Sequence, residues 1–525
     1  MIHRIIVIYG LILILLVSAG GGCTPMSAQE EQPAYWPGDT WRTSTPEEQG
    51  LDSGLILGML DEIQSQKLAI HSILIVRHGY LVTEVYYPPY QQDTRHPSHS
   101  ITKSFTSAMV GKALQEGYIQ NLQQKALEFF PDIAQEPTDP RRTEITLEHL
   151  LTMSAGYNTN TLPDLYGKDA SFDTARNILT YNSVLVQPGT SFYYDSGLPH
   201  LLSAIVQKST GMTLRDYAEQ ELFRPLDITD YSWDSDPSGI TNGATGLALR
   251  PRDMAKFGYL YLQHGRWNGT QLLPEEWVQA STSKHIETKG LMNAAEDDGY
   301  GYLWWIDSFG GFSAHGYGGQ YIFVLPALDM VIVFTSGLPV SLFPTPNQLV
   351  RNYLLPAAKA SGPLPSDPQA SQALADRIQV IEQGEPSEAV LPEIARQISG
   401  KTFQIPQKPY AAMYDAITLT FTDGDTYQYE VEWPGGEKIS AIGSLKHEFH
   451  LNQVTYPATP PIELLIPLRG YWQDETTFVQ EYIQNLNTDI ELVTEKFTFT
   501  GDRVSIEATP GVSLETVRVS GEMVK

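Results

Sequence analysis

A serine and a lysine three residues apart, Ser100 and Lys103, are the side chains in this sequence best suited to covalent chemistry. Apolar residues fall close to one face of the segment that follows Pro97 and ends at Gly117, so a helix is expected there, with both side chains on one face. A serine hydroxyl needs a base, and a lysine amine becomes one where burial or a neighbouring cation lowers its pKa. Backbone N–H groups at a helix start can also stabilise an oxyanion. The pair therefore predicts nucleophilic catalysis.

The same Ser-x-x-Lys spacing occurs a second time, at Ser281 and Lys284. That copy lies among polar residues just after Trp277 and has no apolar helix behind it. It is an internal control for chance matches, so the assignment of Ser100 depends on its context.

Further motifs supply that context. Ser100-Ile-Thr-Lys103 resembles the first motif of the serine β-lactamase and penicillin-binding-protein superfamily, especially class C β-lactamases, related esterases and 6-aminohexanoate-dimer hydrolases. Residues 188–196 resemble its second motif, Tyr-x-Asn preceded by Pro-Gly-x-x-Phe. The resemblance implies that Tyr194 is the catalytic tyrosine and that Ser196 replaces the usual asparagine. Serine reaches less far than an amide and lacks its paired donor and acceptor, which weakens β-lactam recognition more than acyl transfer.

The third family motif, Lys-Thr-Gly or His-x-Gly, aligns in two registers. The favoured register, Ala314-His315-Gly316, puts Ala314 in the cationic position; a shift by one puts His315 there. In both, the small Gly316 lets a substrate lie against the strand edge. In the favoured register, the N–H of Tyr317 would join that of Ser100 as the oxyanion hole. A missing cation argues against a strict requirement for a substrate carboxylate.

The resemblance covers residues 46–365, our predicted hydrolase domain. Its other supports are residues 145–156, 249–278, 300–305 and 315–320. It implies an α+β fold of the β-lactamase/transpeptidase type, with an antiparallel sheet flanked by helices, a mainly helical insertion and the site between them. Apolar β-branched runs at 72–76 and 330–334 predict buried strands, and 55–63 and 201–208 predict helices.

Residues 1–23 are expected to be a signal peptide, because the apolar run 5–17 is shorter than the roughly 20 residues of a membrane span. Cys23, the lone cysteine, resembles the lipidation site of bacterial lipoproteins, although Gly20 replaces the usual bulky apolar residue. The expectation is an exported protein anchored by lipid to the bacterial cell envelope, with membrane contact through Cys23 only. An ordinary cleaved signal is the alternative. Residues 24–45 are predicted to be a tether.

Residues 366–397 are expected to form a linker with a short helix at 373–381. From residue 398 to 525, apolar and polar residues alternate between turn signals, as at Tyr427 to Trp433 and around Gly501. That period predicts a small antiparallel β domain. It resembles the small barrel or lipocalin-like appendages of some family members.

Net charge, cysteine count and missing motifs exclude several classes of function. A net charge of −27 would repel phosphate backbones, so no nucleic-acid partner is expected. No Gly-x-Ser-x-Gly or His-Glu-x-x-His motif occurs, and one cysteine cannot build a thiolate zinc site; neither metal nor cofactor is implied. The sequence favours a serine hydrolase that cleaves an ester or amide in a small or peptide-like acyl substrate. A β-lactamase or D-Ala-D-Ala carboxypeptidase, and a non-catalytic cell-envelope binding module, remain alternatives. Whether Lys103 or Tyr194 is the base is left open.

Overall fold

The structure is a computed structural model that describes residues 36–524 except 39, 134–138, 158–173, 181–182, 289–296, 384–389, 407–413, 423, 447 and 457–460. The chain separates into Met1–Tyr35 and Trp36–Lys525. The first unit, which contains Cys23, lies outside the described residues. Within the described part, no helix combines the length and apolarity needed to cross a bilayer.

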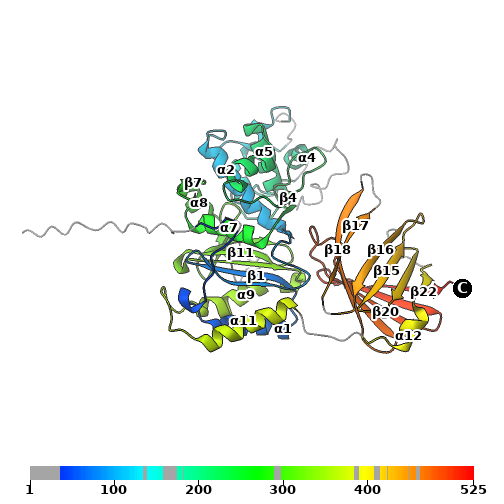
Figure 1. Ribbon diagram of the computed structural model, residues 1–525. Coiled ribbons are helices and arrows are strands. Elements are labelled where there is room, and N and C mark those ends of the chain that lie inside the picture. Colours follow the sequence, from blue (N-terminus) through cyan, green and yellow to red (C-terminus); the bar gives the residue numbers. More distant parts are fainter. Residues whose placement is uncertain are drawn as a thin grey trace, which may run out of the picture. The chain divides into compact units, whose positions relative to one another are not determined.

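A seven-stranded antiparallel sheet forms the centre of the hydrolase region, in the order β2-β1-β12-β11-β10-β9-β8 (Figure 1). The two buried strands expected from the sequence are confirmed as β1 and β12. The strands are β1 (Ile70–Arg77), β2 (Tyr80–Tyr86), β8 (Asp297–Tyr300), β9 (Trp305–Asp307), β10 (Phe312–Gly316), β11 (Gln320–Leu325) and β12 (Met330–Ser336).

Both faces of this sheet are covered, because successive side chains of its central strands enter different cores. Leu74 and Val76 of β1 pack into one core and Ile73 and Ile75 into the other, as strand alternation requires. Helix α7 (Pro251–Leu262) packs on the first face, and α1 (Ser53–Ser65) lies against the second (Figure 1). An uninterrupted apolar strand is stable here because neither face meets water.

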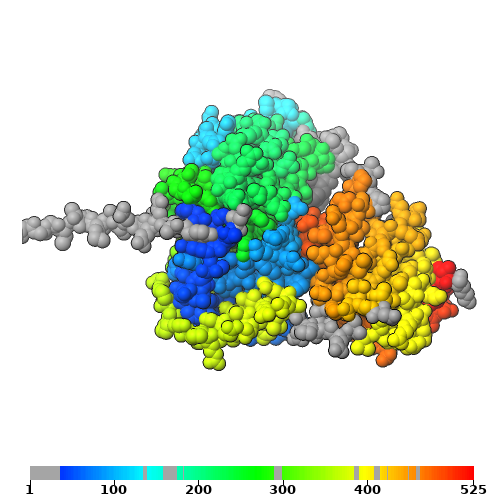
Figure 2. All heavy atoms as spheres, in the orientation of Figure 1, coloured from blue at the N-terminus to red at the C-terminus, as the bar shows by residue number. Residues whose placement is uncertain are grey.

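The region expected to be a linker with a short helix contains α11 (Pro368–Gln383), which is longer than the predicted 373–381. Helix α11 packs along α1, and its Leu374 is buried in the second core. The yellow-green atoms of α11 lie along the lower side of the hydrolase region in Figure 2. Trp41, in the predicted tether, is buried in the first core. The packed hydrolase layers therefore include residues on both sides of the predicted 46–365 domain.

Helices α2, α4 and α5 form a layer above the first face of the sheet (Figure 1). The expected helix over 201–208 is confirmed within α5, which packs against α2. The remaining elements of the hydrolase region include α2 (Thr102–Gln115), α3 (Leu147–Leu151), α4 (Thr174–Thr180), α5 (Gly197–Thr210), α6 (Leu214–Ala218), α8 (Glu275–Ser281), α9 (Thr345–Leu349), α10 (Leu355–Ala357), β3 (His96–Pro97), β4 (Tyr231–Trp233), β5 (Leu247–Leu249), β6 (Arg266–Trp267) and β7 (Thr270–Gln271). The fold is thus mixed helices and antiparallel sheet of the β-lactamase/transpeptidase type.

The C-terminal region is a ten-stranded sheet closed like a barrel, in the order β16-β15-β14-β13-β22-β21-β20-β19-β18-β17. A parallel pairing of Ser444 with Arg469 joins β16 to β18 and closes it. Phe497, Phe499 and Ile506, from the alternating stretch around Gly501, lie in its core. Helix α12 (Glu393–Ile398) precedes the strands, which are β13 (Lys401–Gln404), β14 (Ala416–Phe421), β15 (Thr426–Glu432), β16 (Lys438–Ser444), β17 (His450–Tyr456), β18 (Ile462–Trp472), β19 (Thr477–Tyr482), β20 (Val493–Thr500), β21 (Arg503–Pro510) and β22 (Val517–Met523).

Candidate active site

Ser100 lies at the tip of α2, in a short 3-10 turn over His99–Ile101 that leads into the helix. Ser98, just before this turn, is fixed to β5. Its backbone N–H donates to the carbonyl oxygen of Leu247 at 2.9 Å, and its hydroxyl donates to the same oxygen at 2.6 Å. His99 has a φ of 47°, a left-handed conformation that costs a non-glycine residue about 1–3 kcal/mol. This sharp turn presents Ser100 in a partly exposed position.

The Lys103 amine lies in direct contact with the Ser100 hydroxyl. Its Nζ lies 2.8 Å from Ser100 Oγ and donates to the carbonyl of Ala244 at 2.9 Å. The residue is 1% exposed. Burial lowers the pKa of Lys103 to about 7, and the negative charge of Asp195 opposes part of that effect. A large share of the amine is therefore neutral near pH 7 and able to accept a proton.

Tyr194 completes the group from a segment about 90 residues further along the chain. Lys103 Nζ lies 5.0 Å from the centre of its ring. Burial raises the pKa of the phenol to about 12, so it keeps its proton at neutral pH, although the Ser100 side chain is close enough to the phenol to lower that pKa in part. The ring stacks on Trp305 at 5.8 Å with an interplanar angle of 24°. Alcohol, amine and phenol thus converge.

The end of β10 lies beside the tip of α2. A Cβ on Gly316 would stand 2.4 Å from the carbonyl oxygen of Ser98, so glycine is required for this approach. The next residue, Tyr317, is 45% exposed, and its ring meets His99 edge-on at 5.7 Å. The contact places the backbone around Tyr317 next to the backbone that leads into Ser100, where the sequence predicts the two oxyanion donors.

Neither register of the third motif supplies a cation from β10. Ala314 is 1% exposed and packs in the core. His315 Nε2 lies 2.7 Å from Ser313 Oγ, and its ring stacks on Trp305 at 5.1 Å. Burial lowers the pKa of His315 to about 3, so its imidazole is neutral in either register. Trp305 stacks on both His315 and Tyr194, which places the histidine one ring away from the phenol.

Ser196 follows the phenol segment at the N-cap of α5. It is 4% exposed, and its side chain makes no capping hydrogen bond to that helix. The adjacent Asp195 is fully buried, and its carboxylate accepts from the backbone N–H of Gly197 at 2.9 Å. Asp195, rather than Ser196, is the residue of this segment whose charge acts on the lysine.

A loop that the motifs do not include holds the amine in place. Asn242 Oδ1 accepts from the backbone N–H groups of Ala244 at 3.0 Å and Thr245 at 3.2 Å, which shapes the turn that presents the Ala244 carbonyl to Lys103. Thr106, on α2, donates to the carbonyl of Gly243 at 2.7 Å. Sequence reasoning missed this loop because its decisive group is a backbone carbonyl, which has no signature in residue type.

The second Ser-x-x-Lys copy has no comparable geometry. Ser281 is buried and donates to the carbonyl of Val278 at 3.2 Å. Lys284 instead pairs with Glu287 at 2.8 Å and Asp298 at 3.4 Å. The chance-match interpretation of this copy agrees with these contacts. Among the residues that the structure describes, no three His, Cys, Asp or Glu side chains lie where they could share a metal ion.

The fold and the Ser-Lys-Tyr constellation define a serine hydrolase. The family model "Beta-lactamase" matches residues 49–352, more than half of the chain, and the chain belongs to the beta-lactamase family. It is 25% identical over 297 residues to the 6-aminohexanoate-dimer hydrolase of Paenarthrobacter ureafaciens, an alignment that covers 53% of this chain and 75% of that protein. It is 26% identical over 178 residues to a beta-lactamase of Escherichia coli strain K12, covering 33% and 45%. The octameric penicillin-binding protein homologue from Pyrococcus abyssi is similar in structure, with 18% identity, a TM-score of 0.47 and coverage of 89% and 99%.

Proposed function

We propose that this enzyme hydrolyses ester or amide bonds through a covalent acyl-enzyme on Ser100. The supporting observation is the buried Lys103 amine, 2.8 Å from the Ser100 hydroxyl oxygen and with a pKa of about 7. A base acts best when its pKa lies near the working pH. Tyr194 has a pKa of about 12, so its phenolate is too rare at neutral pH to compete as the resting base. Lys103 is therefore assigned as the base.

In the first half-reaction, Ser100 Oγ bonds to the substrate carbonyl carbon as its proton passes to neutral Lys103. The Tyr194 phenol donates its proton to the leaving group as the carbon–heteroatom bond breaks, and the Lys103 ammonium restores the phenol. In the second, water attacks the acyl carbon and gives a proton to Lys103, which returns it to the departing Ser100 alkoxide. Protons balance over the cycle, and the enzyme returns to its starting state.

The substrate preference follows from what lines the site. Strand β10 offers a neutral His315 and an apolar Ala314 where related enzymes place a cation. The wall beside Tyr194 is aromatic: Phe192 contacts Trp305 and Tyr300, at ring distances of 6.0 and 5.1 Å. These features favour small esters or linear amides with an apolar acyl part, and they do not favour substrates that need a carboxylate recognised by this strand.

A matched pair of variants tests the assignment. Ser100→Ala should abolish turnover of p-nitrophenyl butyrate and labelling by a fluorescent fluorophosphonate, whereas Ser281→Ala should retain both. Peptide mass spectrometry of the labelled wild type should find the adduct on Ser100. Equal turnover in the two variants would refute the proposal. Efficient hydrolysis of nitrocefin, with little on esters, would replace it with a β-lactamase assignment.

We further propose that the protein is exported and held at the cell envelope by a lipid on Cys23, because an apolar segment of signal-peptide length ends just before this residue. Two or more acyl chains would hold such a protein firmly, whereas one holds only marginally. Metabolic labelling with palmitate should mark the wild type and not Cys23→Ala. Undiminished labelling of the variant would show that Cys23 is not the anchor.

A further inference from the structure

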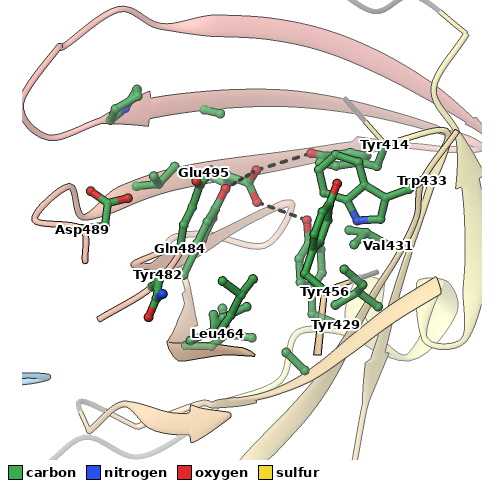
Figure 3. A pocket seen from close by; sticks show the side chains of 18 of the residues that line it. Tyr414, Tyr429, Val431, Trp433, Tyr456, Leu464, Tyr482, Gln484, Asp489 and Glu495 are labelled. Carbon is green, nitrogen blue, oxygen red and sulfur yellow. Dashed lines mark hydrogen bonds between the residues drawn. The ribbon is translucent and has the colours of Figure 1, made fainter. Parts of the chain in front are cut away.

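The C-terminal barrel contains a partly open cavity of about 750 Å³. Its residues all belong to the barrel and its loops, from Tyr414 to Val517. Most of the wall is apolar, as at Ile466 and at Val431 and Leu464, the last two labelled in Figure 3. Ligand pockets in proteins typically measure about 300–1,000 Å³. The barrel interior therefore has room for an organic molecule, in a region that the proposed hydrolysis does not use.

A buried carboxylate, Glu495, lies at the wall of this cavity. Glu495, on β20, is 2% exposed. Gln480 Nε2 donates to it at 2.9 Å, whereas the hydroxyls of Tyr414, Tyr429 and Tyr482 approach it only to 3.4–3.5 Å (Figure 3). Those three distances are at the outer limit of a hydrogen bond, and an ionised carboxylate can accept about four good ones. In its anionic form Glu495 is incompletely stabilised by the protein.

The charges of the cavity have one sign. Of its lining residues, all within the described part of the chain, two are acidic, Asp489 and Glu495, and none is lysine, arginine or histidine. A buried carboxylate without a cationic partner is costly, since the charge loses its hydration. A positive group inside the cavity would remove that cost.

Aromatic rings surround the same space. Tyr429 and Tyr482 flank the carboxylate, and Trp433 and Tyr456 stand further along the wall, their rings 5.8 Å apart and nearly perpendicular (Figure 3). Aromatic faces attract organic cations, most strongly where water is excluded. Carboxylate and rings together match an alkylammonium group, and the apolar wall matches a hydrocarbon body.

We propose that the barrel binds an amphiphilic organic cation, with its ammonium group at Glu495 among the tyrosines and its apolar part along Val431, Leu464 and Ile466. A neutral or anionic amphiphile of the same length fits the apolar wall but leaves the carboxylate without a counter-ion. The site therefore selects by charge.

The titration of Glu495 gives the site a pH dependence. Burial raises the pKa of its carboxyl to about 7, and the hydrogen bonds from Gln480 and the three tyrosines oppose that rise. The ionisable groups around it are Asp489, Tyr414, Tyr429, Tyr456 and Tyr482 on the cavity wall and Tyr427 behind Gln480, none of which carries a positive charge. A permanent cation should therefore bind more tightly as the pH rises from 6 to 8, by about tenfold, because the ionised share of Glu495 rises by that factor.

Calorimetry with the purified full chain tests the proposal, using decyltrimethylammonium below its micellar concentration. Decanol and decanoate are the matched neutral and anionic probes. At pH 8 the cation should bind at one per chain and at least tenfold more tightly than either. Glu495→Gln should remove that preference, whereas Glu507→Gln, an outward-facing residue paired with Arg518, should keep it. Unchanged esterase activity and circular dichroism would show that the Glu495→Gln variant is folded.

A measurement on the wild type does not depend on any variant. At pH 7 about half of the Glu495 carboxyls are protonated, so binding of the quaternary cation should release roughly half a proton, measured by calorimetry in buffers of different ionisation enthalpy. Equal affinity for cation and alcohol, no proton release, or an unaffected cation affinity in Glu495→Gln would each overturn the proposal.

Discussion

The pH dependence of acylation separates the two residues that the sequence leaves open as the base. If Lys103 accepts the proton, kcat/KM follows its neutral fraction in the free enzyme. With a pKa of about 7, that fraction is roughly 0.1 at pH 6, half at pH 7 and 0.9 at pH 8. An ordinary lysine, at 10.5, would be neutral in only about 3 molecules in 10,000 at pH 7. Burial thus raises the neutral fraction of the lysine at pH 7 about a thousandfold.

The assay is kcat/KM for p-nitrophenyl butyrate from pH 5.5 to 9.5, with the rate of Ser100→Ala subtracted. We expect a rise of about tenfold between pH 6 and 8, followed by a plateau. If a Tyr194 phenolate were the base, its pKa of about 12 would make the rate climb through pH 9 without levelling. A profile without a plateau would therefore refute the assignment of Lys103.

A single substitution tests the electrostatic origin of that pKa. Asp195 raises the pKa of Lys103, so Asp195→Asn should lower it and move the acid limb of the profile to lower pH. Asparagine keeps an oxygen that can accept from the Gly197 N–H, so the start of α5 should remain intact. The matched control is Asp216→Asn, an exposed aspartate paired with Arg215, which should leave the limb in place. A limb that stays fixed, or moves to higher pH, in Asp195→Asn would contradict the reasoning.

Three further substitutions test other parts of the site. Tyr194→Phe keeps the stacked ring but loses the proton donor, so steady-state kinetics should show kcat lowered about 10²–10⁴-fold with KM little changed. Gly316→Ala places a Cβ 2.4 Å from the Ser98 carbonyl oxygen. It should lower the free energy of unfolding measured in urea by about 1–3 kcal/mol and should also lower activity. The control, Gly362→Ala, adds a Cβ with no atom within 4 Å and should change neither. Asn242→Ala leaves two buried N–H groups without an acceptor; it should lower kcat and destabilise by about 1–3 kcal/mol, and unchanged kcat would show that the loop does not position Lys103.

The sequence could predict the convergence of Ser100, Lys103 and Tyr194 because each carries its chemistry in its side chain and belongs to a motif. It could not fix the register of the third motif, because a one-residue slip exchanges the two faces of a strand. The structure shows that either register leaves β10 without a cation, since Ala314 is apolar and burial keeps His315 neutral. The Ala244 carbonyl was invisible in the sequence, as a backbone acceptor is the same in every residue.

The β domain shows a different limit of prediction from sequence. Alternation around Gly501 predicted an antiparallel β domain, and Phe497 and Phe499 from that stretch lie in the core of the domain. Alternation does not report whether inward side chains fill the interior, because that depends on strand number and closure. The cavity around Glu495 therefore emerged only from the structure. Helix α11 is a related case: its short apolar stripe was visible, but its packing on α1 depends on a partner more than 300 residues earlier.

Two of the buried titratable groups, Lys103 and Glu495, act on stability with opposite signs in adjoining pH ranges. Glu495 has a raised pKa, so the stability it contributes is present below its ordinary 4.5 and falls by about 3 kcal/mol as the pH rises to about 7. Lys103 has a lowered pKa, so stability rises by about 5 kcal/mol from about 7 to its ordinary 10.5. The sum of these two contributions to the free energy of unfolding has its minimum near pH 7. At that pH about half of the Lys103 amine is neutral and about half of the Glu495 carboxyl is ionised. Thermal unfolding at pH 5, 7 and 9 should show Glu495→Gln losing the fall on the acid side and Lys103→Met losing the rise on the alkaline side. If the stability of both variants changed with pH in parallel with that of the wild type, neither group would be the source of this pH dependence.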